Sequence, residues 1–128
     1  MVNHQKPAIA IFGGSFDPPH SGHQLIVEKA IESLTMEKLI VLPAYLNPFK
    51  TSTLADAHTR LSWCHTLFDP MDRVEVSDYE IKEGKSTVTS QSVKHFNQPY
   101  HVKYLIIGSD NLSTLTKWHE FEWLNENV

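Results

Sequence analysis

Short, largely apolar runs are the feature of this sequence that most restricts its fold. They occupy residues 8–12 (AIAIF), 38–42 (KLIVL) and 102–107 (VKYLII), with a shorter run at residues 74–76 (VEV). A run without polar residues at every second position is typical of a strand buried on both faces, as in a parallel sheet covered by helices. Each of the three longer runs is followed by a glycine or a proline, which ends a strand. The pattern therefore predicts a parallel sheet.

Segments with helical spacing lie between these strands. After Ser21, apolar residues recur every three or four positions, and Ser21 with Gln24 matches a capping box that would start a helix. Further helices are expected over residues 54–68, 86–96 and 112–124. Strands that alternate with helices form right-handed βαβ units, so the sequence predicts an α/β protein. Ligands of such proteins bind beyond the carboxyl ends of the strands.

The composition fits a single globular domain over residues 1–128 and excludes several classes of protein. Apolar residues make up 41% of the chain, and the formal net charge of -4 argues against a surface that coats nucleic acid. No apolar run approaches the roughly 20 residues that span a bilayer, and the N-terminal apolar stretch is too short for a signal peptide. The single cysteine, Cys64, fits a buried core residue in a reducing compartment. We expect a cytoplasmic protein without membrane contact.

The segment GGSFDPPHSGH, which begins at Gly13, carries the densest chemistry of the sequence. Gly13 and Gly14 allow the backbone to approach a ligand closely, and the two prolines stiffen the path into the following helix. The first amides of that helix, left uncovered at Gly22, attract an anion together with the helix dipole. His20 and His23 flank the same helix start, so both imidazoles can point at one anion. The segment therefore predicts a phosphate-binding turn.

Alternative roles for this segment fit its residues less well. A Walker P-loop would need a glycine at the position of Tyr79, and a GxGxxG pattern is absent because the first two glycines are adjacent. Zinc held by His20, His23 and Asp17 would lack a fourth ligand, since the only cysteine is remote. If the two histidines only cap the helix, both imidazoles are left without a chemical role.

The same segment resembles the GxFDPxHxGH signature of the nucleotidyltransferase superfamily that carries the HxGH motif. Its FDPPH form is most similar to bacterial nicotinate-nucleotide adenylyltransferases. The resemblance continues through LPAYLNPFK (residues 42–50), GKSTVTSQSV (84–93) and GSDNLSTLTKW (108–118), and so covers nearly all of residues 8–124. Because seven residues are specified in a fixed frame, this signature is far more specific than a bare glycine loop.

The resemblance implies a fold, a reaction and a metal. The fold is a Rossmann-like parallel sheet in the order 3-2-1-4, with flanking helices and without the family's fifth strand. In the reaction, the phosphate of nicotinate mononucleotide attacks the α-phosphate of ATP, which gives nicotinate adenine dinucleotide and pyrophosphate. Mg²⁺ is expected to be held mainly by the ATP phosphates and water.

The resemblance also implies roles for individual residues. His20 and His23 are the catalytic residues that contact the ATP phosphates, with His23 as the donor in the transition state. The ATP site is expected to comprise Gly13, Gly14, Ser15, Phe16, Asp17, Gly22, Gly108 and Asp110, and the substrate site Lys50, Arg60, Thr89, Leu115 and Trp118. A solvated surface cation is the alternative for Lys50 and Arg60, and a helix N-cap is the alternative for Asp110.

One motif of the family has no counterpart in this sequence. Family members carry a Ser-Ser/Thr-x-x-Arg helix start that binds ATP phosphates, whereas the last arginine here is Arg73. The chain is therefore expected to be a truncated domain whose fourth strand is an exposed edge, able to pair with another copy. Two alternatives remain: an inactive nucleotide-binding fragment, or a related adenylyltransferase for nicotinamide mononucleotide or phosphopantetheine.

Overall fold

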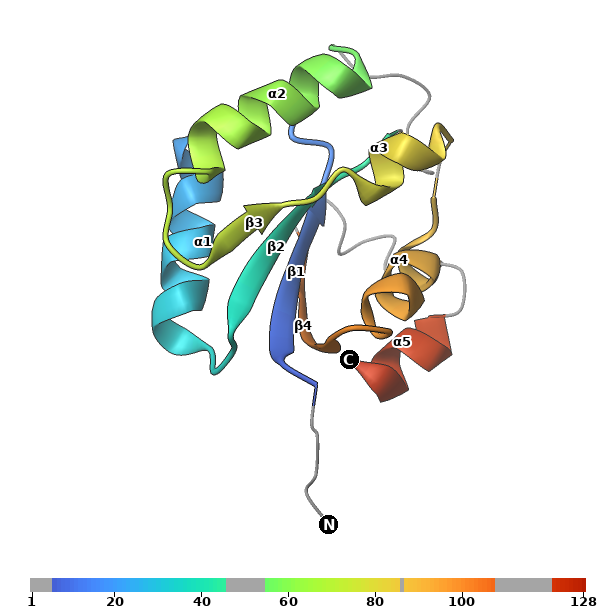
Figure 1. Ribbon diagram of the computed structural model, residues 1–128. Coiled ribbons are helices and arrows are strands. Elements are labelled where there is room, and N and C mark those ends of the chain that lie inside the picture. Colours follow the sequence, from blue (N-terminus) through green and yellow to red (C-terminus); the bar gives the residue numbers. More distant parts are fainter. Residues whose placement is uncertain (1–5, 46–54, 86, 108–120) are drawn as a thin grey trace.

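The sheet is parallel throughout, and its strand order reverses once. A computed structural model describes residues 6–45, 55–85, 87–107 and 121–128. Within that part the strands are β1 (Ala8–Gly14), β2 (Lys38–Pro43), β3 (Val74–Val76) and β4 (His101–Ile106). They lie in the order β3-β2-β1-β4, with β1 paired in parallel to both β2 and β4 (Figure 1). This confirms the expected order 3-2-1-4 and places the switch point between β1 and β4.

Continuous apolar composition explains why β1 and β2 occupy the middle of the sheet. Residues 9–12 and 39–42 are at most 2% exposed. Ala10 of β1 belongs to the core on one face of the sheet, and Ile9 and Ile11 belong to the core on the other. β4 lies at an edge of the sheet, and its residues 104–106 are only partly buried.

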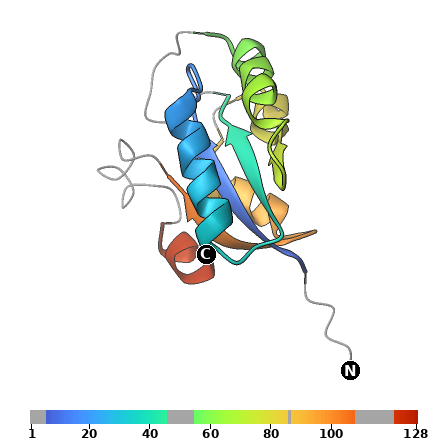
Figure 2. The same ribbon diagram turned by 90° about the vertical axis from the view of Figure 1, so that its left-hand side faces the viewer.

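Helices cover both faces of this sheet. α1 (Ser21–Ser33) and α2 (Ala57–Phe68) pack on one face, while α3 (Tyr79–Glu83), α4 (Thr89–Phe96) and α5 (Phe121–Asn127) lie on the other. Figure 2 shows α1 in front of the strands and α4 behind them. None of the helices in the described part of the chain is both long and apolar enough to cross a membrane.

The helices begin near the predicted positions, and local contacts explain the differences. α2 starts at Ala57 rather than at residue 54 because Asp56 caps it, with Oδ1 accepting a hydrogen bond from the Thr59 amide at 2.8 Å. α4 starts at Thr89 rather than at residue 86, after Val88 in an extended conformation. Of the helix predicted over residues 112–124, only the last part falls within the described residues.

α3 is missing from the sequence-based prediction. Its five residues are too few to show a helical period, and they include the buried polar residue Glu80. The available signal is Gly84, whose φ of 65° lies in the left-handed region that ends many helices. A C-terminal glycine without a preceding periodic segment was not enough to reveal the helix.

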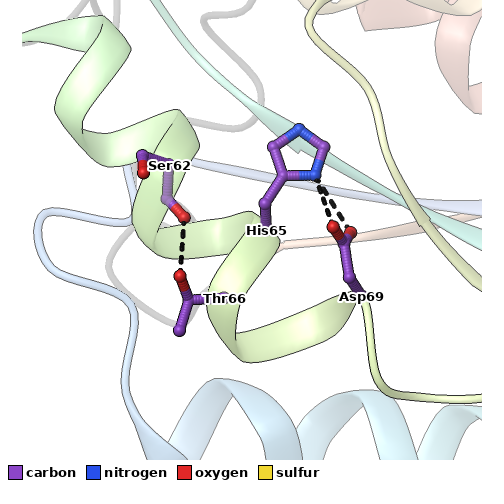
Figure 3. A network of polar contacts seen from close by, with 4 residues as sticks. All are labelled: Ser62, His65, Thr66 and Asp69. Atoms are coloured by element: carbon purple, nitrogen blue, oxygen red, sulfur yellow. Dashed lines mark hydrogen bonds and ion pairs between the residues drawn. The ribbon is translucent and has the colours of Figure 1, made fainter.

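The outer face of α2 carries polar contacts within the helix. Thr66 Oγ1 donates a hydrogen bond to the Ser62 carbonyl oxygen at 3.2 Å, and His65 Nδ1 lies 2.9 Å from Asp69 Oδ2 (Figure 3). Exposed contacts of this spacing stabilise a helix by only about 0.3 to 0.5 kcal/mol.

On the inner face Cys64 is fully buried, and burial raises the pKa of its thiol to about 12. The thiol is thus a core group, as expected from the sequence.

Candidate active site

The turn between β1 and α1 lies at the carboxyl edge of the sheet, beside the segment that leaves β2. The Gly14 carbonyl oxygen accepts a hydrogen bond from the Ala44 amide at 2.9 Å, which joins the two segments. The chain then passes through the cis Asp17–Pro18 peptide and enters α1 after His20. This edge, next to the switch point of the sheet, is where parallel α/β proteins bind their ligands.

His20 and His23 cap α1 reciprocally. The Gly22 amide donates to His20 Nδ1 at 3.0 Å, and the His20 amide donates to His23 Nδ1 at 3.0 Å. The predicted capping box of Ser21 and Gln24 is therefore wrong, because an imidazole nitrogen one position earlier takes the same role. Gln24 instead donates to the Leu67 carbonyl oxygen at 3.2 Å and so links α1 to α2.

The two caps define the tautomers of both rings. A nitrogen that accepts an amide hydrogen carries no proton, so in each neutral imidazole the proton is on Nε2. The ring centroids of His20 and His23 lie 4.0 Å apart with the planes 33° from parallel. Capping and ligand contact therefore do not exclude each other, because Nδ1 serves the helix while Nε2–H is the donor. The alternative in which the histidines cap the helix is correct in its geometry, and a chemical role for the two Nε2–H groups stays a prediction.

Gly22 fits beneath the His20 ring, where a side chain would not. A Cβ atom at this position would lie 2.8 Å from His20 Cε1 and 2.9 Å from Nδ1, both closer than real contacts allow. Uncovered amides at the helix start are the reason for this glycine that the sequence suggests. The structure adds a second reason, because any side chain at residue 22 would displace the ring that caps the helix.

Phe16 packs against the ring of His23. Its ring is 3% exposed and lies 5.0 Å from the His23 ring, 5.2 Å from Phe12 and 6.1 Å from Phe68. Its φ of 51° is in the left-handed region, which costs a non-glycine residue about 1 to 2 kcal/mol. Burial of an aromatic ring offsets a cost of that size. Gly14 fits against the same ring, since a Cβ there would lie 3.3 Å from it.

Arg60 of α2 joins the loops around this turn. Its side chain is fully buried, and the guanidinium donates hydrogen bonds of 2.7 to 3.1 Å to four backbone carbonyl groups. The acceptors are Ser15, Ala44, Tyr45 and Ala55. The alternative of a solvated surface cation is therefore wrong. Arg60 positions the turn after β1 and the loop after β2, while its direct contact with substrate stays a prediction that these bonds do not favour.

Asp17 belongs to the same arrangement. Its Oδ1 accepts a hydrogen bond from the Ala55 amide at 2.9 Å, so the turn after β1 and the entry to α2 are joined on a second side. Burial lowers the pKa of the Arg60 guanidinium, and the nearby Asp17 carboxylate opposes that shift. The carboxylate thus acts on the loop geometry, and its predicted contact with ATP is not tested by these bonds.

The start of α4 is built differently. Val88 at the N-cap offers no side-chain hydrogen bond, and Thr89, the predicted substrate-binding residue, is the partly exposed first residue of the helix. One turn further on, Ser92 Oγ donates to Glu80 Oε2 of α3 at 2.6 Å. The remaining predicted site residues, Lys50, Gly108, Asp110, Leu115 and Trp118, lie outside the described residues.

Comparison with known proteins identifies the family. A sequence model described as cytidylyltransferase-like matches residues 11–128. A Sulfurovum sp. protein named "Probable nicotinate-nucleotide adenylyltransferase" is 68% identical over 128 residues, which is 100% of this chain and 68% of the relative. This chain belongs to the nicotinate-nucleotide adenylyltransferase family. A relative of the same name from Nitratiruptor sp. is 49% identical over 122 residues, or 94% of this chain and 69% of the relative.

A solved structure also supports the fold assigned to this family member. The Plasmodium falciparum nicotinic acid mononucleotide adenylyltransferase complexed with NaAD superposes with a TM-score of 0.75 at 23% identity. The match covers 92% of this chain and 60% of the Plasmodium chain. At that identity the similarity shows the α/β fold alone, and it agrees with the strand order found here.

Four residues near the carboxyl edge of the sheet were missed or assigned differently from the sequence. Glu80 and Ser92 meet across α3 and α4, and no local pattern links two residues that are 12 positions apart. Arg60 was found, but its burial was not expected because arginines on helices usually face solvent. Phe16 was assigned to the ATP site, and its burial against the His23 ring was not predicted.

Proposed function

We propose that the chain transfers the adenylyl group of ATP to nicotinate mononucleotide, forming nicotinate adenine dinucleotide and pyrophosphate. The observation that carries this proposal is the capping pair at the start of α1, which fixes Nε2–H of His20 and His23 as donors. Two such donors beside a helix N-terminus suit phosphate oxygens whose charge grows in a transition state. The name of the relative that is 68% identical supports the choice of substrates.

The reaction is an in-line displacement at phosphorus. A phosphate oxygen of the mononucleotide forms a bond to the α-phosphorus of ATP, while the bond to the oxygen that bridges to the β-phosphate breaks. That oxygen leaves with pyrophosphate and keeps the bonding electrons. The protein acts by positioning and by neutralising charge. In our proposal, His23 and His20 donate to the phosphate oxygens, and amides of Gly14, Ser15 and Phe16 line the same site.

We also propose that Mg²⁺ enters with the nucleotide. Among the residues described here, no group of three or more His, Cys, Asp or Glu side chains can hold a metal ion, which also gives no support to a zinc site. The groups proposed near the turn are N–H hydrogen-bond donors and not metal ligands. They fit an ion that is held mainly by phosphate oxygens and water, the coordination that Mg²⁺ favours. When bound, the ion neutralises charge on those oxygens.

The acceptor is proposed to bind at the start of α4, with Thr89 as a contact. By resemblance, Lys50, Leu115 and Trp118 complete the substrate site, while Gly13, Asp17, Gly22, Gly108 and Asp110 complete the ATP site. Arg60 contributes through the loops that it holds. In this proposal the ATP phosphates bind at the start of α1, and the acceptor binds at the start of α4.

The test is pyrophosphate release by the chain with ATP, Mg²⁺ and one of three acceptors. We expect turnover with nicotinate mononucleotide to exceed turnover with nicotinamide mononucleotide and with phosphopantetheine. Faster turnover with either of the other two would reassign the acceptor. If none is used while calorimetry still detects ATP binding, the chain is an inactive nucleotide-binding fragment.

We further infer that the chain acts in the cytoplasm and associates with a second copy through β4. In the described part of the chain β4 pairs with β1 on one side only, which leaves backbone donors and acceptors along its other edge. The single cysteine supports the reducing compartment. Light scattering at increasing protein concentration tests the association, and a constant monomer mass would contradict it.

A further inference from the structure

Among the described residues three hydrogen bonds join α3 and α4. One, from Gln91 Nε2 to the Tyr79 hydroxyl at 3.2 Å, is partly buried, and the other two differ most in character. In the first, Ser92 Oγ donates to Glu80 Oε2 at 2.6 Å, and both residues are buried, at 1% and 7% exposure. In the second, Gln91 Nε2 donates to Glu83 Oε1 at 3.0 Å on the surface. The two bonds leave adjacent residues of α4 and reach the same short helix. They therefore form a natural pair for comparison.

The buried bond is costly for the fold. Removing a carboxyl group from water is unfavourable, and burial raises the pKa of Glu80 to about 7 although the bond from Ser92 acts in the opposite direction. A pair of apolar side chains would fill the same space without this penalty. A buried carboxyl group with a single short hydrogen bond is therefore better explained by what it positions than by stability.

The element that Glu80 positions is the first turn of α4. This helix begins without a side-chain cap at Val88, and only backbone bonds from Gln91 and Ser92 to the Val88 carbonyl oxygen close its first turn among the described residues. The Ser90 hydroxyl, 1% exposed, has no hydrogen-bond partner among the described residues and does not help. Ser92 lies three residues after Thr89, which is about one helical turn. Its bond to Glu80 therefore holds α4 one turn away from Thr89, the residue proposed to contact the acceptor.

The surroundings of α3 and α4 connect this bond to the carboxyl edge of the sheet. Val93 of α4 shares its core cluster with Leu42, next to the end of β2. The Ser77 amide, just before α3, donates to the Val41 carbonyl oxygen at 2.9 Å. Both helices are thus anchored near the end of β2, at the same edge of the sheet where the histidine pair starts α1.

We propose that the Glu80–Ser92 hydrogen bond is a positioning contact for the acceptor nucleotide, which holds the start of α4 and with it Thr89 in the geometry that binds this substrate. The inference rests on the proposed function, because it needs an acceptor site at α4. It makes Glu80 a positioning residue rather than a catalytic one. ATP binds at α1 in this scheme, so its affinity does not depend on Glu80.

The test compares variants of the buried bond with a matched variant of the surface bond. Glu80→Met and Ser92→Ala remove the buried bond, Glu80→Gln keeps an acceptor oxygen, and Glu83→Met removes the surface bond. In Glu80→Met and Ser92→Ala we expect KM for nicotinate mononucleotide to rise about tenfold, the size expected for one buried hydrogen bond. KM for ATP and kcat should stay within about twofold. Glu80→Gln and Glu83→Met should resemble the unaltered chain.

Several results would overturn the proposal. One is a parallel rise of KM for both substrates, which is the mark of general loosening. Others are an unchanged KM for the mononucleotide in Ser92→Ala, or a rise in Glu83→Met equal to that in Glu80→Met. Ser92→Ala removes only one oxygen atom, so it decides the question if Glu80→Met does not fold.

A second measurement needs no catalysis. Amide hydrogen exchange over residues 88–92, followed by mass spectrometry, should accelerate in Glu80→Met and Ser92→Ala but not in Glu83→Met. Equal exchange in these three variants would refute the positioning role. Lack of turnover by the unaltered chain would instead count against the proposed function alone. In that case exchange, together with calorimetric binding of nicotinate mononucleotide, still decides the role of Glu80.

Discussion

Two helices that begin at the carboxyl edge of the sheet, α1 and α4, have their first turns held in opposite ways. α1 is closed by its own residues, because His20 and His23 each accept an amide hydrogen of the turn that they belong to. α4 has no side-chain cap and is held by Glu80 of another helix. A self-capped helix start keeps its shape with or without a ligand. A helix start that is held by a residue of another helix depends on that tertiary contact, so the same substitution should act differently at the two sites.

The largest effect is expected from His23→Ala. The change removes both a cap of α1 and the proposed donor to the phosphate, so turnover should fall about 10²- to 10³-fold and stability by about 1 kcal/mol. Steady-state pyrophosphate release and urea unfolding measure the two effects separately.

Ser21→Ala is the matched control, since Ser21 was the predicted cap but His20 has that role. It should leave both quantities unchanged. If Ser21→Ala destabilised the chain as much as His23→Ala, the assignment of the cap to the imidazoles would be wrong.

A pH series with Glu80→Gln examines the other helix. Burial raises the pKa of the folded-state carboxyl group from 4.5 to about 7, so between these values the folded chain binds more protons than the unfolded chain. This group therefore makes the chain less stable as pH rises from about 4.5 to 7, and the deficit is constant above that. Relative to Glu80→Gln, the unaltered chain should lose about 3 kcal/mol between pH 4.5 and pH 8.

Urea unfolding of both proteins at several pH values measures this difference, in which the shared titrating groups cancel. Glu83→Gln, an exposed carboxylate of the same helix, serves as the control and should follow the unaltered chain. Parallel pH curves for Glu80→Gln and the unaltered chain would show that Glu80 titrates at an ordinary value.

Gly22→Ala tests whether α1 tolerates a change beneath its cap. The new Cβ would lie 2.8 Å from the His20 ring, and we expect this crowding to lower the free energy of unfolding by about 1 to 2 kcal/mol. The higher helix propensity of alanine, about 1 kcal/mol, acts in the opposite direction. Gly13→Ala is the control, because a Cβ there meets no atom within 4 Å. Thermal unfolding of both variants is the measurement. Equal stabilities would mean that the His20 ring moves aside at no cost.

The smallest effect is expected from Val88→Asp, which would give α4 the local cap that it lacks. Val88 has φ and ψ of -76° and 148°, which suit an N-cap residue. The carboxylate should stabilise the chain by about 1 kcal/mol and reduce the loss caused by Ser92→Ala. Chemical unfolding of the single and double variants tests this. If the changes in the free energy of unfolding simply add in the double variant, the new cap and the Glu80–Ser92 bond stabilise the start of α4 independently.

The same contrast explains how much of the structure could be predicted from the sequence. β1 and β2 could be predicted because burial on both faces leaves a continuous apolar run. The turn from Gly13 to His23 could be located by its motif, but its cap was assigned to Ser21 and Gln24 instead of the two histidines. α3 could not be predicted, since five residues show no period. The partners of Arg60 and Glu80 could not be predicted either, because each side chain contacts residues from other segments. The local sequence contains no pattern that indicates such a contact.

The clamp formed by Arg60 has a consequence for the segment between β2 and α2. Arg60 binds the carbonyl oxygens of Tyr45 and Ala55, which stand at the two ends of residues 46–54. The two ends of that segment are thus held together by a side chain of α2. Closing a longer loop costs only slightly more entropy, about 0.6 kcal/mol for each doubling of length. A change in the number of residues between Tyr45 and Ala55 should therefore cost little stability and leave the sheet in place.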